Sequence, residues 1–543
     1  MVNVKESGVI VDPVGKRIFK GHLFISSNKI VKIVEDENAP ERYILPGFVD
    51  SHIHIESSLM SCEEFSKVCA IHGTIATISD PHEIANVCGI TGIEYMLKSS
   101  ENSLTKMFFS LPSCVPATTF ETSGAIITSN ELSPFYKNDK VVSLGEVMNI
   151  PGVLSGDIDL IKKIRDAVCN GRVVDGHGPN LLGNDLIGYV NAGVQTDHES
   201  SELYEAREKL EQGMLIQIRQ GSAAKDLEKL APLVQESSEK IMLCSDDLHP
   251  DDFLKGHINR TVSFLMEKGY EIFKILSSAS VNPVKLYKLP VGLLQVGDFA
   301  DYIVVDSLEP DFKVLKTVVD GKTVFENGEV LKDIKQPKLI NNFNINQISK
   351  QDLSIYPKKD TIRVITVKDG ELLTGEIHSK IDGLGDNIVS DIENDILKIV
   401  VLNRYNKAPA SIGFVKGFQL KKGAYATSVA HDSHNIIAVG VDDNVICKAI
   451  NCVIDSKGGM SYYDEENCFT MTLPIGGLMS DKNYKTVVHE YEELLKVSKS
   501  SGCKLSSPFM TLSFLSLLVI PKLKIGDRGL FDYSKFDFTE LFV

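Results

Sequence analysis

A run of eight short apolar segments that alternate with helical patterns constrains this chain more than any other feature. The segments lie between residues 46 and 288, and most of them end in polar side chains. They are VDSHIHI (49–55), GTIATISD (73–80), KMFFSLPS (106–113), VVSLGEVM (141–148), RVVDGHG (172–178), GVQTDHES (193–200), MLIQIRQG (214–221) and IMLCSDD (241–247). Eight strands alternating with helices over about 240 residues match a (β/α)8 barrel in count and length. A doubly wound open sheet would carry a Gly-rich phosphate turn after its first strand, and none follows here.

Both flanks of the central region read as short strands and turns. The dipeptides Asp320-Gly321 and Asn327-Gly328 are typical of tight hairpins. We therefore expect one small β-sandwich built from both flanks, and a C-terminal α/β domain that follows a polar linker at 341–353. The predicted domains are a composite β-sandwich at 1–45 plus 289–345, a barrel at 46–288 and a C-terminal α/β domain at 346–543.

Polar side chains recur where the predicted barrel strands end. His52 and His54 are two residues apart, so their side chains share one face of the first strand. One such pair is weak evidence, because polar pairs also occur on solvated strand faces. Comparable residues end later strands: Asp80 with His82 and Glu83, Glu146, His177, His198, and Asp246 with Asp247. Barrel enzymes carry their functional groups at this rim, so the recurrence predicts a divalent-metal site there.

Several of these segments together resemble the amidohydrolase superfamily and, within it, the microbial adenine deaminase family. The resemblance is carried by PGFVDSHIHIESS, SDPHEIANV, GEVMN, DGHGP, TDHES and CSDD in the barrel. It extends into the C-terminal region through AHDSHN and LPIGGLMSD, and so covers nearly the whole chain. The two histidines of the first strand mark only the superfamily, whereas GEVMN, DGHGP and TDHES are more specific.

The resemblance implies a centre of two divalent ions, with manganese or iron favoured and zinc as an alternative. Glu146 stands where several relatives use a carboxylated lysine to bridge two metals. Asp246 directly follows the apolar run and Ser245, but the adjacent Asp247 keeps the choice of the eighth-strand acid open. The implied metal ligands are His52, His54, Glu146, His177, His198 and Asp246. The implied catalytic residues are Asp246, His82 and Glu83, with Asp80 also a candidate for orienting water or substrate.

The resemblance also implies the reaction, which is hydrolysis of adenine to hypoxanthine and ammonia by attack of a metal-activated hydroxide at C6. A divalent metal lowers the pKa of bound water from 15.7 towards about 7, and an aspartate beside it can take up a proton. One alternative is an amidohydrolase that acts on a cyclic amide. Another is a catalytically inactive relative that serves as a scaffold. The zinc deaminases of the cytidine type match His54 and Glu56, but they also need a P-C-x-x-C segment, which is absent.

Two further polar segments have open interpretations. Arg219, Gln220 and Ser222 end the seventh strand and can bind a purine edge, or Ser222 can cap a helix over AAKDLEKL. His431 and His434 either form a polar turn between strands or belong to a loop that lines or caps the active site.

Composition bears mainly on partners. The net charge of −16 argues against nucleic-acid and anionic-membrane partners, and the neutral base adenine needs no basic funnel. The ten cysteines form no C-x-x-C pair, which favours a reducing compartment. The start lacks the apolar core of a signal peptide, and the stretch SFLSLLVI is too short to span a bilayer. We expect a cytoplasmic protein with a small-molecule substrate and, from the resemblance, a homo-oligomer.

Overall fold

The structure is a computed structural model that describes residues 4–222, 224–331, 338–381 and 386–543. The chain forms two compact units. The barrel unit comprises Met1–Pro81, Met96–Ser113 and Thr128–Pro337, and the C-terminal unit comprises His82–Tyr95, Cys114–Ile127 and Lys338–Val543. The domain boundaries expected from the sequence remain a prediction.

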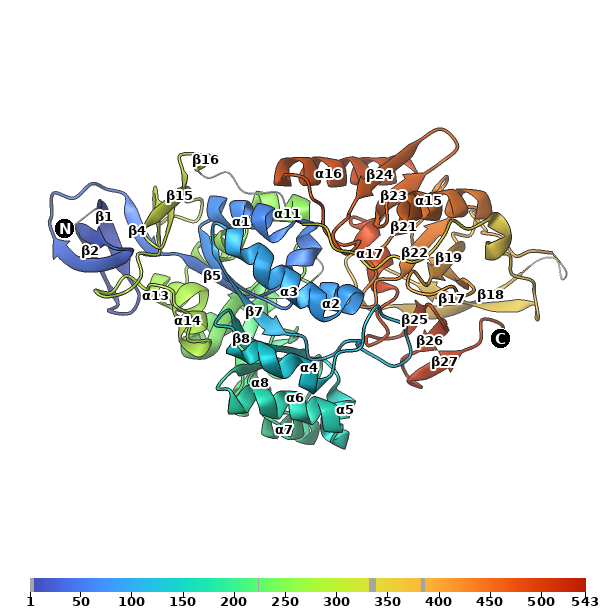
Figure 1. Ribbon diagram of the computed structural model, residues 1–543, viewed down its shortest axis with the longest axis horizontal. Helices are drawn as coiled ribbons and strands as arrows, with labels where there is room; N and C mark the ends of the chain where they lie inside the picture. Colours follow the sequence, from blue (N-terminus) through green and yellow to red (C-terminus); the bar gives the residue numbers. More distant parts are fainter. Residues whose placement is uncertain (1–3, 223, 332–337, 382–385) are drawn as a thin grey trace. The chain divides into compact units, whose positions relative to one another are not determined.

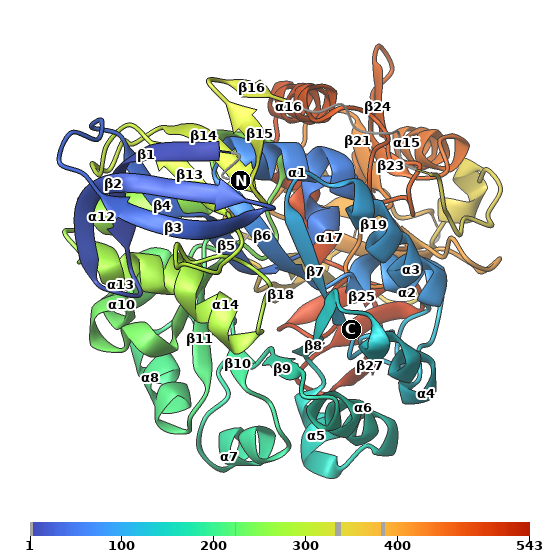
Figure 2. The same cartoon turned by 60° about the vertical axis from the view of Figure 1, so that its left-hand side comes forward.

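Eight parallel strands form the barrel, and all eight predicted strands are confirmed (Figure 2). The first five make one sheet and the last three make another. Gln195 N donates to Val174 O at 2.9 Å and joins the two sheets, and a parallel bridge between Ile53 and Asp246 closes the ring. The strands are β5 (Phe48–Ile53), β6 (Thr74–Ser79), β7 (Lys106–Leu111), β8 (Val141–Val147), β9 (Val173–Gly176), β10 (Thr196–Asp197), β11 (Leu215–Arg219) and β12 (Ile241–Cys244).

The barrel strands form where they do because both of their faces are covered. Every residue of β5, β6 and β8 is buried, which explains why these segments read as nearly continuous apolar runs. Helices begin at polar caps: Ser61 accepts from Glu64 N before α1, and Asp157 accepts from Leu160 N before α6. Figure 2 shows α6, α7 and α8 outside the strands. The helices of this unit are α1 (Cys62–Ile71), α4 (Ser129–Leu132), α5 (Ile150–Ser155), α6 (Ile158–Cys169), α7 (Gly183–Asn191), α8 (Leu203–Glu211), α9 (Leu227–Leu230), α10 (Pro232–Glu236), α11 (Pro250–Lys255), α12 (Ile258–Glu267), α13 (Ile272–Leu276) and α14 (Asn282–Leu286).

The predicted helix cap at Ser222 is wrong. The helical segment starts only at Leu227, after Asp226, and breaks before Pro232, which cannot donate a backbone hydrogen bond. Ser222 Oγ instead donates to Asp252 Oδ2 at 2.8 Å and accepts from His249 N at 3.0 Å.

The two flanks of the barrel join in one β unit, as expected, but their strands pair into a single eight-stranded sheet where the sequence predicts a sandwich (Figure 1). Strand β4 leads directly into the first barrel strand, and Ile44 pairs with Val304 where the two flanks meet. The hairpin residues Asp320 and Gly321 adopt left-handed φ values of 50° and 70°, which suit a type I′ turn. The strands are β1 (Val4–Asp12), β2 (Arg17–Ser26), β3 (Lys29–Glu35), β4 (Tyr43–Pro46), β13 (Tyr302–Val305), β14 (Val314–Val319), β15 (Lys322–Glu326) and β16 (Glu329–Val330).

The C-terminal unit is an α/β fold around a mixed sheet of eight strands, in the order β18-β17-β20-β19-β22-β21-β23-β24. Ile446 and Ile450 of α15 pack with Val400 and Ala438 of the sheet. Leu353, at the end of the predicted linker, is fully buried in the same core, so that segment is more than a connector. The strands are β17 (Thr361–Thr366), β18 (Gly375–Lys380), β19 (Leu397–Leu402), β20 (Ser411–Lys416), β21 (Ala424–Thr427), β22 (Ile436–Gly440), β23 (Gly459–Tyr463) and β24 (Cys468–Thr472). The helices are α15 (Asp443–Asp455), α16 (Tyr484–Ser500) and α17 (Pro508–Phe514).

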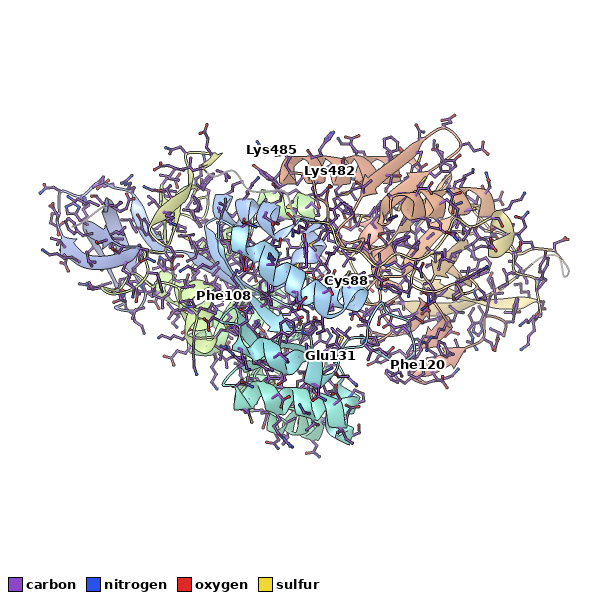
Figure 3. The ribbon with its side chains drawn as sticks, in the orientation of Figure 1. Cys88, Phe108, Phe120, Glu131, Lys482 and Lys485 are labelled. Carbon is purple, nitrogen blue, oxygen red and sulfur yellow. The ribbon has the colours of Figure 1, made fainter. Side chains whose placement is uncertain are left out.

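Two segments from earlier in the sequence belong to this unit. One begins with α2 (His82–Cys88) and runs into α3 (Ile90–Ser99). The other carries Phe120, whose ring centroid lies 5.1 Å from that of Phe531 and 5.6 Å from that of Phe538 (Figure 3). These partners lie on a small sheet of β25 (Leu523–Gly526), β26 (Gly529–Asp532) and β27 (Asp537–Thr539). No helix in the described part of the chain combines the length and apolar character that crossing a membrane requires.

Candidate metal centre

Imidazoles and carboxylates converge at one rim of the barrel unit. Three groups in this unit each bring potential metal-ligating atoms within 4.8 Å of one another, and the groups share members. They are His52 with His54 and Asp246, His52 with Glu146 and His198, and His177 with His198 and Glu199. All of these side chains are buried apart from His177 and Glu199, which are half-buried.

The first strand and the eighth strand supply one side of the cluster. His54 Nε2 lies 3.3 Å from His52 Nε2 and 3.0 Å from Asp246 Oδ1. His54 Nδ1 lies 3.0 Å from the carbonyl oxygen of Asp80 and therefore carries the proton that it donates there. When the ring is neutral, the lone pair of His54 is thus on Nε2, facing the cluster, as in histidines that bind metal through this atom.

Glu146 connects this side to the other. Its Oε1 lies 3.3 Å from His54 Nε2, while its Oε2 lies 2.5 Å from His177 Nδ1 and 3.3 Å from His198 Nε2. His198 Nε2 is buried and meets hydrogen-bond geometry with no described residue, although two carboxylates lie within 3.6 Å of it. A carboxylate that turns its two oxygens to different histidines is the arrangement needed to bridge two ions. The donor set fits manganese, iron or zinc.

Local backbone structure holds the two carboxylates in place. Asp80 Oδ2 accepts from Glu146 N at 3.0 Å, and a Cβ on Gly145 would lie 2.0 Å from that oxygen, so only glycine fits before Glu146. Asp246 has a left-handed φ of 56°, and its N–H donates to His52 O at 3.0 Å. Strained backbone of this kind is typical of functional sites.

Electrostatics favour the metal-binding forms of His52 and of the two carboxylates. Burial, together with His198 and His54, holds the pKa of His52 well below its usual range. Burial opposes ionisation of Glu146 and Asp246, but facing histidines, and Arg219 beside Asp246, outweigh it. The pKa of each carboxyl is therefore well below its usual range. Neutral imidazole and ionised carboxylate are the forms that bind metal. Against the opposing effect of burial, the surrounding carboxylates raise the pKa values of His54, His177 and His198, so a binding metal would displace protons from these three rings.

The eighth-strand acid that faces the cluster is Asp246. Asp247 Oδ1 instead accepts from Ser57 Oγ at 2.5 Å. The geometry therefore favours Asp246 as the acid beside the ligands.

Arg219 lies beside this acid, in a network of carboxylates. Its guanidinium donates to Asp246 Oδ2 at 2.9 Å, to Asp226 Oδ2 at 3.1 Å and to Glu199. It is buried, and these carboxylates, against the opposing effect of burial, raise its pKa well above its usual value. Arg219 thus orients Asp246, in addition to any contact that it makes with a substrate. Gln220 follows Arg219 on the same loop, and the Ser222 hydroxyl donates to Asp252.

Sequence reasoning did not assign roles to two residues that support the histidines. Glu199, which directly follows His198 in TDHES, lies 3.7 Å from His177 Nδ1. Lys209 on α8 is fully buried, and its Nζ donates to Asp197 Oδ2 at 2.8 Å and to Gly178 O at 2.5 Å. Asp197 and Gly178 are the chain neighbours of the ligands His198 and His177, so one lysine anchors both ligand loops. Adjacency to a ligand would have revealed Glu199, whereas Lys209 reads as an ordinary helix lysine.

The remaining predicted residues lie in the C-terminal unit. His82 and Glu83 form the start of α2, and His431 and His434 lie in the turn between β21 and β22. The polar turn between strands is therefore the location that the structure gives to both histidines. His431 Nδ1 lies 3.7 Å from Glu83 Oε1, and His82 Nε2 lies 3.7 Å from Asp432 Oδ1.

Comparisons with known proteins identify the family of this chain. An amidohydrolase family model matches residues 43–324, and a model of the adenine deaminase C-terminal domain matches residues 371–537. An adenine deaminase of Methanosarcina mazei is 46% identical over 99% of both chains, and one of Sulfurovum sp. is 46% identical over 98% of both. A crystal structure of dihydropyrimidinase from Brevibacillus agri has a TM-score of 0.47 and 15% identity, covering 60% of this chain and 96% of its own. By its full-length identity to these deaminases and its two matching domains, the chain belongs to the adenine deaminase family of the amidohydrolases.

Proposed function

We propose that this protein hydrolyses adenine to hypoxanthine and ammonia. Its relatives over nearly the whole chain carry the name adenine deaminase. The observation that carries the proposal is Glu146, whose two oxygens face different histidines in a buried cluster. In the reaction, water adds its oxygen to C6, the bond from C6 to the exocyclic nitrogen breaks, and that nitrogen leaves as ammonia.

The proposed metal ligands are His52, His54, Glu146, His177, His198 and Asp246. We favour manganese or iron, with zinc as an alternative, because mixed imidazole and carboxylate ligands suit all three. Divalent ions held there would lower the pKa of a water molecule towards about 7. The protein contributes fixed carboxylates and imidazoles in a buried setting, so that the ions would meet ligands already oriented for them.

Asp246 is the proposed base. Its carboxylate is ionised and lies 3.0 Å from His54, and Arg219 fixes the other oxygen, so one oxygen can accept a proton in a defined direction. We propose that His82 and Glu83 deliver protons to the purine ring or the leaving amine. The two residues follow Asp80 closely in the chain. Arg219, Gln220 and Ser222 remain proposed substrate-binding residues.

Ammonia release from adenine is the direct test. The full chain, supplied with manganese or iron, is assayed on adenine and on adenosine, hydantoin and dihydroorotate. We expect release from adenine above all others. Turnover of hydantoin or dihydroorotate but not adenine would favour a cyclic-amide hydrolase, and a metal-replete protein that turns over none of them would favour a scaffold.

We further propose that adenine is the sole class of partner needed for this activity, with neither nucleic acid nor membrane involved. The acidic net charge of −16 supports this view. A cytoplasmic location and a homo-oligomeric state are proposed with it. Sedimentation of the purified chain tests the oligomeric state.

A further inference from the structure

The C-terminal unit contains a second buried cluster, made of Glu83, His431 and His434. Their potential ligand atoms lie within 4.8 Å of one another, and each side chain is at most 7% exposed. Glu83 Oε1 lies 3.7 Å from His431 Nδ1, and Glu83 Oε2 lies 3.9 Å from His434 Nε2. Asp432 Oδ1 also lies 3.7 Å from His431 Nδ1.

Three elements of the fold build this cluster. Glu83 lies in the first turn of α2, while both histidines come from the turn between β21 and β22. The ring of His431 stacks on Phe514 of α17, with centroids 4.4 Å apart and planes at 19°. Packing of this kind restricts the ring to one orientation, so the histidines are held in place before any ligand arrives.

The hydrogen bonds of His434 distinguish a metal ligand from a proton donor. Ala430 N donates to His434 Nδ1 at 3.2 Å, so the lone pair of the neutral ring is on Nδ1 and the proton is on Nε2. Burial, with His431 and Arg404 nearby, holds the pKa of His434 well below its usual range and keeps the ring neutral. Nε2 is buried without a hydrogen-bond partner among the described residues. It therefore presents an N–H towards Glu83, the reverse of His54, and is poorly suited to bind a metal.

We propose that His434, assisted by His431, is a positioning residue that orients the carboxylate of Glu83 for proton transfer. The inference rests on the function proposed for Glu83 in adenine deamination. A direct hydrogen bond is excluded at 3.9 Å. The N–H acts through a bridging water, or approaches the carboxylate when substrate binds, as long catalytic contacts in free enzymes commonly do.

Two substitutions of His434 separate folding from function. Asparagine places a side-chain oxygen near the position of Nδ1, so His434→Asn keeps the acceptor for Ala430 N but loses the donor towards Glu83. Glutamine places an N–H near the position of Nε2, so His434→Gln keeps that donor but loses the acceptor. We expect His434→Asn to fold normally and to lose about 10- to 100-fold in kcat, the range for residues that support a functional group. We expect His434→Gln to have the lower Tm but the higher kcat of the two.

A double-mutant cycle with Glu83 tests whether His434 acts through that carboxylate. If it does, Glu83→Gln combined with His434→Asn is no slower than Glu83→Gln alone, because residues that act as a unit are not additive. The exposed His489 of α16, changed to asparagine, is the matched control and keeps wild-type kinetics. The measurements are kcat and KM for adenine, Tm, and metal content per chain.

Each outcome has one meaning. Normal kcat in His434→Asn, with Glu83→Gln inactive, overturns the inference and leaves the proposed function intact. Normal kcat in Glu83→Gln removes the role of Glu83 itself. Additive losses in the double variant would show that His434 does not act through Glu83. A metal content of three ions per chain that falls to two in His434→Asn would identify the cluster as a metal site and overturn the proposal.

Discussion

The two buried clusters of this protein contain the same residue types, but their histidines are suited to different roles. In the barrel, His54 donates from Nδ1 to the carbonyl of Asp80, so the neutral ring has its lone pair on Nε2, which faces the other candidate ligands. In the C-terminal unit, His434 accepts at Nδ1 from Ala430 N, which leaves a proton on Nε2. Residue type alone therefore does not distinguish a metal ligand from a proton donor. The partner of the far ring nitrogen does.

The distances between histidine nitrogens and carboxylate oxygens also differ between the two clusters. Glu146 has histidine nitrogens at 2.5 and 3.3 Å from its two oxygens, whereas the nitrogens of His431 and His434 lie 3.7 and 3.9 Å from those of Glu83. The first carboxylate is shared among several ligands, and the second is approached by one histidine on each oxygen. We therefore expect loss of the shared carboxylate in the barrel cluster to change metal content, and substitutions in the C-terminal cluster to change the rate without changing metal content.

The largest effect is expected for Glu146→Gln. An amide nitrogen replaces one of the two oxygens, so the side chain can no longer serve both groups of histidines. We expect metal content to fall from two ions per chain to one or none, with a loss of activity on the order of 10³-fold or more, since the metal supplies several kcal/mol of stabilisation. Elemental analysis and ammonia release check both. Glu131→Gln, at an exposed cap of α4 (Figure 3), is the control, and two ions retained in Glu146→Gln would contradict the bridging role.

Asp246→Asn comes next, because it removes the proposed base while keeping a side chain of the same shape. We expect kcat to fall by about 10²- to 10⁴-fold, the usual contribution of a general base, with metal content largely intact. Asp247→Asn is the matched control, since Asp247 faces Ser57 and not the cluster. If Asp247→Asn were the inactive variant of the pair, the assignment of the eighth-strand acid would be reversed.

Much of the barrel and of its candidate metal site was predictable from local pattern. Parallel strands buried on both faces give apolar runs, and the polar residue after each run marks the rim, as with Glu146 after VVSLG. The hairpin at Asp320-Gly321 was predictable because few residues tolerate its left-handed φ. These features depend on neighbours in the chain, which a sequence displays directly.

What depended on distant contacts was not predictable. Lys209 has Glu205 four residues before it, which reads as an exposed ion pair on a helix, yet both side chains are buried. The sequence placed His82 and Glu83 after the second barrel strand, where α2 does begin, but it did not indicate that α2 belongs to the same compact unit as residues 338–543. That grouping arises from contacts more than 300 residues apart in the chain, such as Glu83 with His431. Likewise, the helix cap at Ser222 failed because its hydroxyl bonds to Asp252 in another segment.

Lys209→Met tests whether a residue outside the barrel cluster holds the loops of its candidate ligands in place. The substitution leaves Asp197 and Glu205 buried without their cation, which costs about 3–5 kcal/mol. It also releases the loops that carry His177 and His198. We expect a lower Tm and metal affinity weaker by about 10- to 100-fold. The control is Lys162→Met, which breaks an exposed ion pair with Asp166 and is expected to change neither quantity. An unchanged metal affinity in Lys209→Met would show that the loops carrying His177 and His198 keep their conformation without the lysine.

The smallest effect is expected for His72, a buried histidine outside both clusters. Burial, with His257 nearby, lowers the pKa of His72 from 6.5 to about 4. Because the folded pKa lies below the unfolded one, protons bind the unfolded chain more readily, and stability falls as the pH drops from about 6.5 to about 4. The loss attributable to this residue at pH 5 is on the order of 2 kcal/mol, at 1.36 kcal/mol per pH unit. His72→Gln should therefore retain wild-type turnover and metal content at pH 7, and show a smaller decrease in Tm between pH 7 and pH 5 than the wild-type chain. Equal decreases would mean that the pKa of His72 is not lowered in the folded protein. A loss of metal in His72→Gln would mean that His72 supports the barrel cluster.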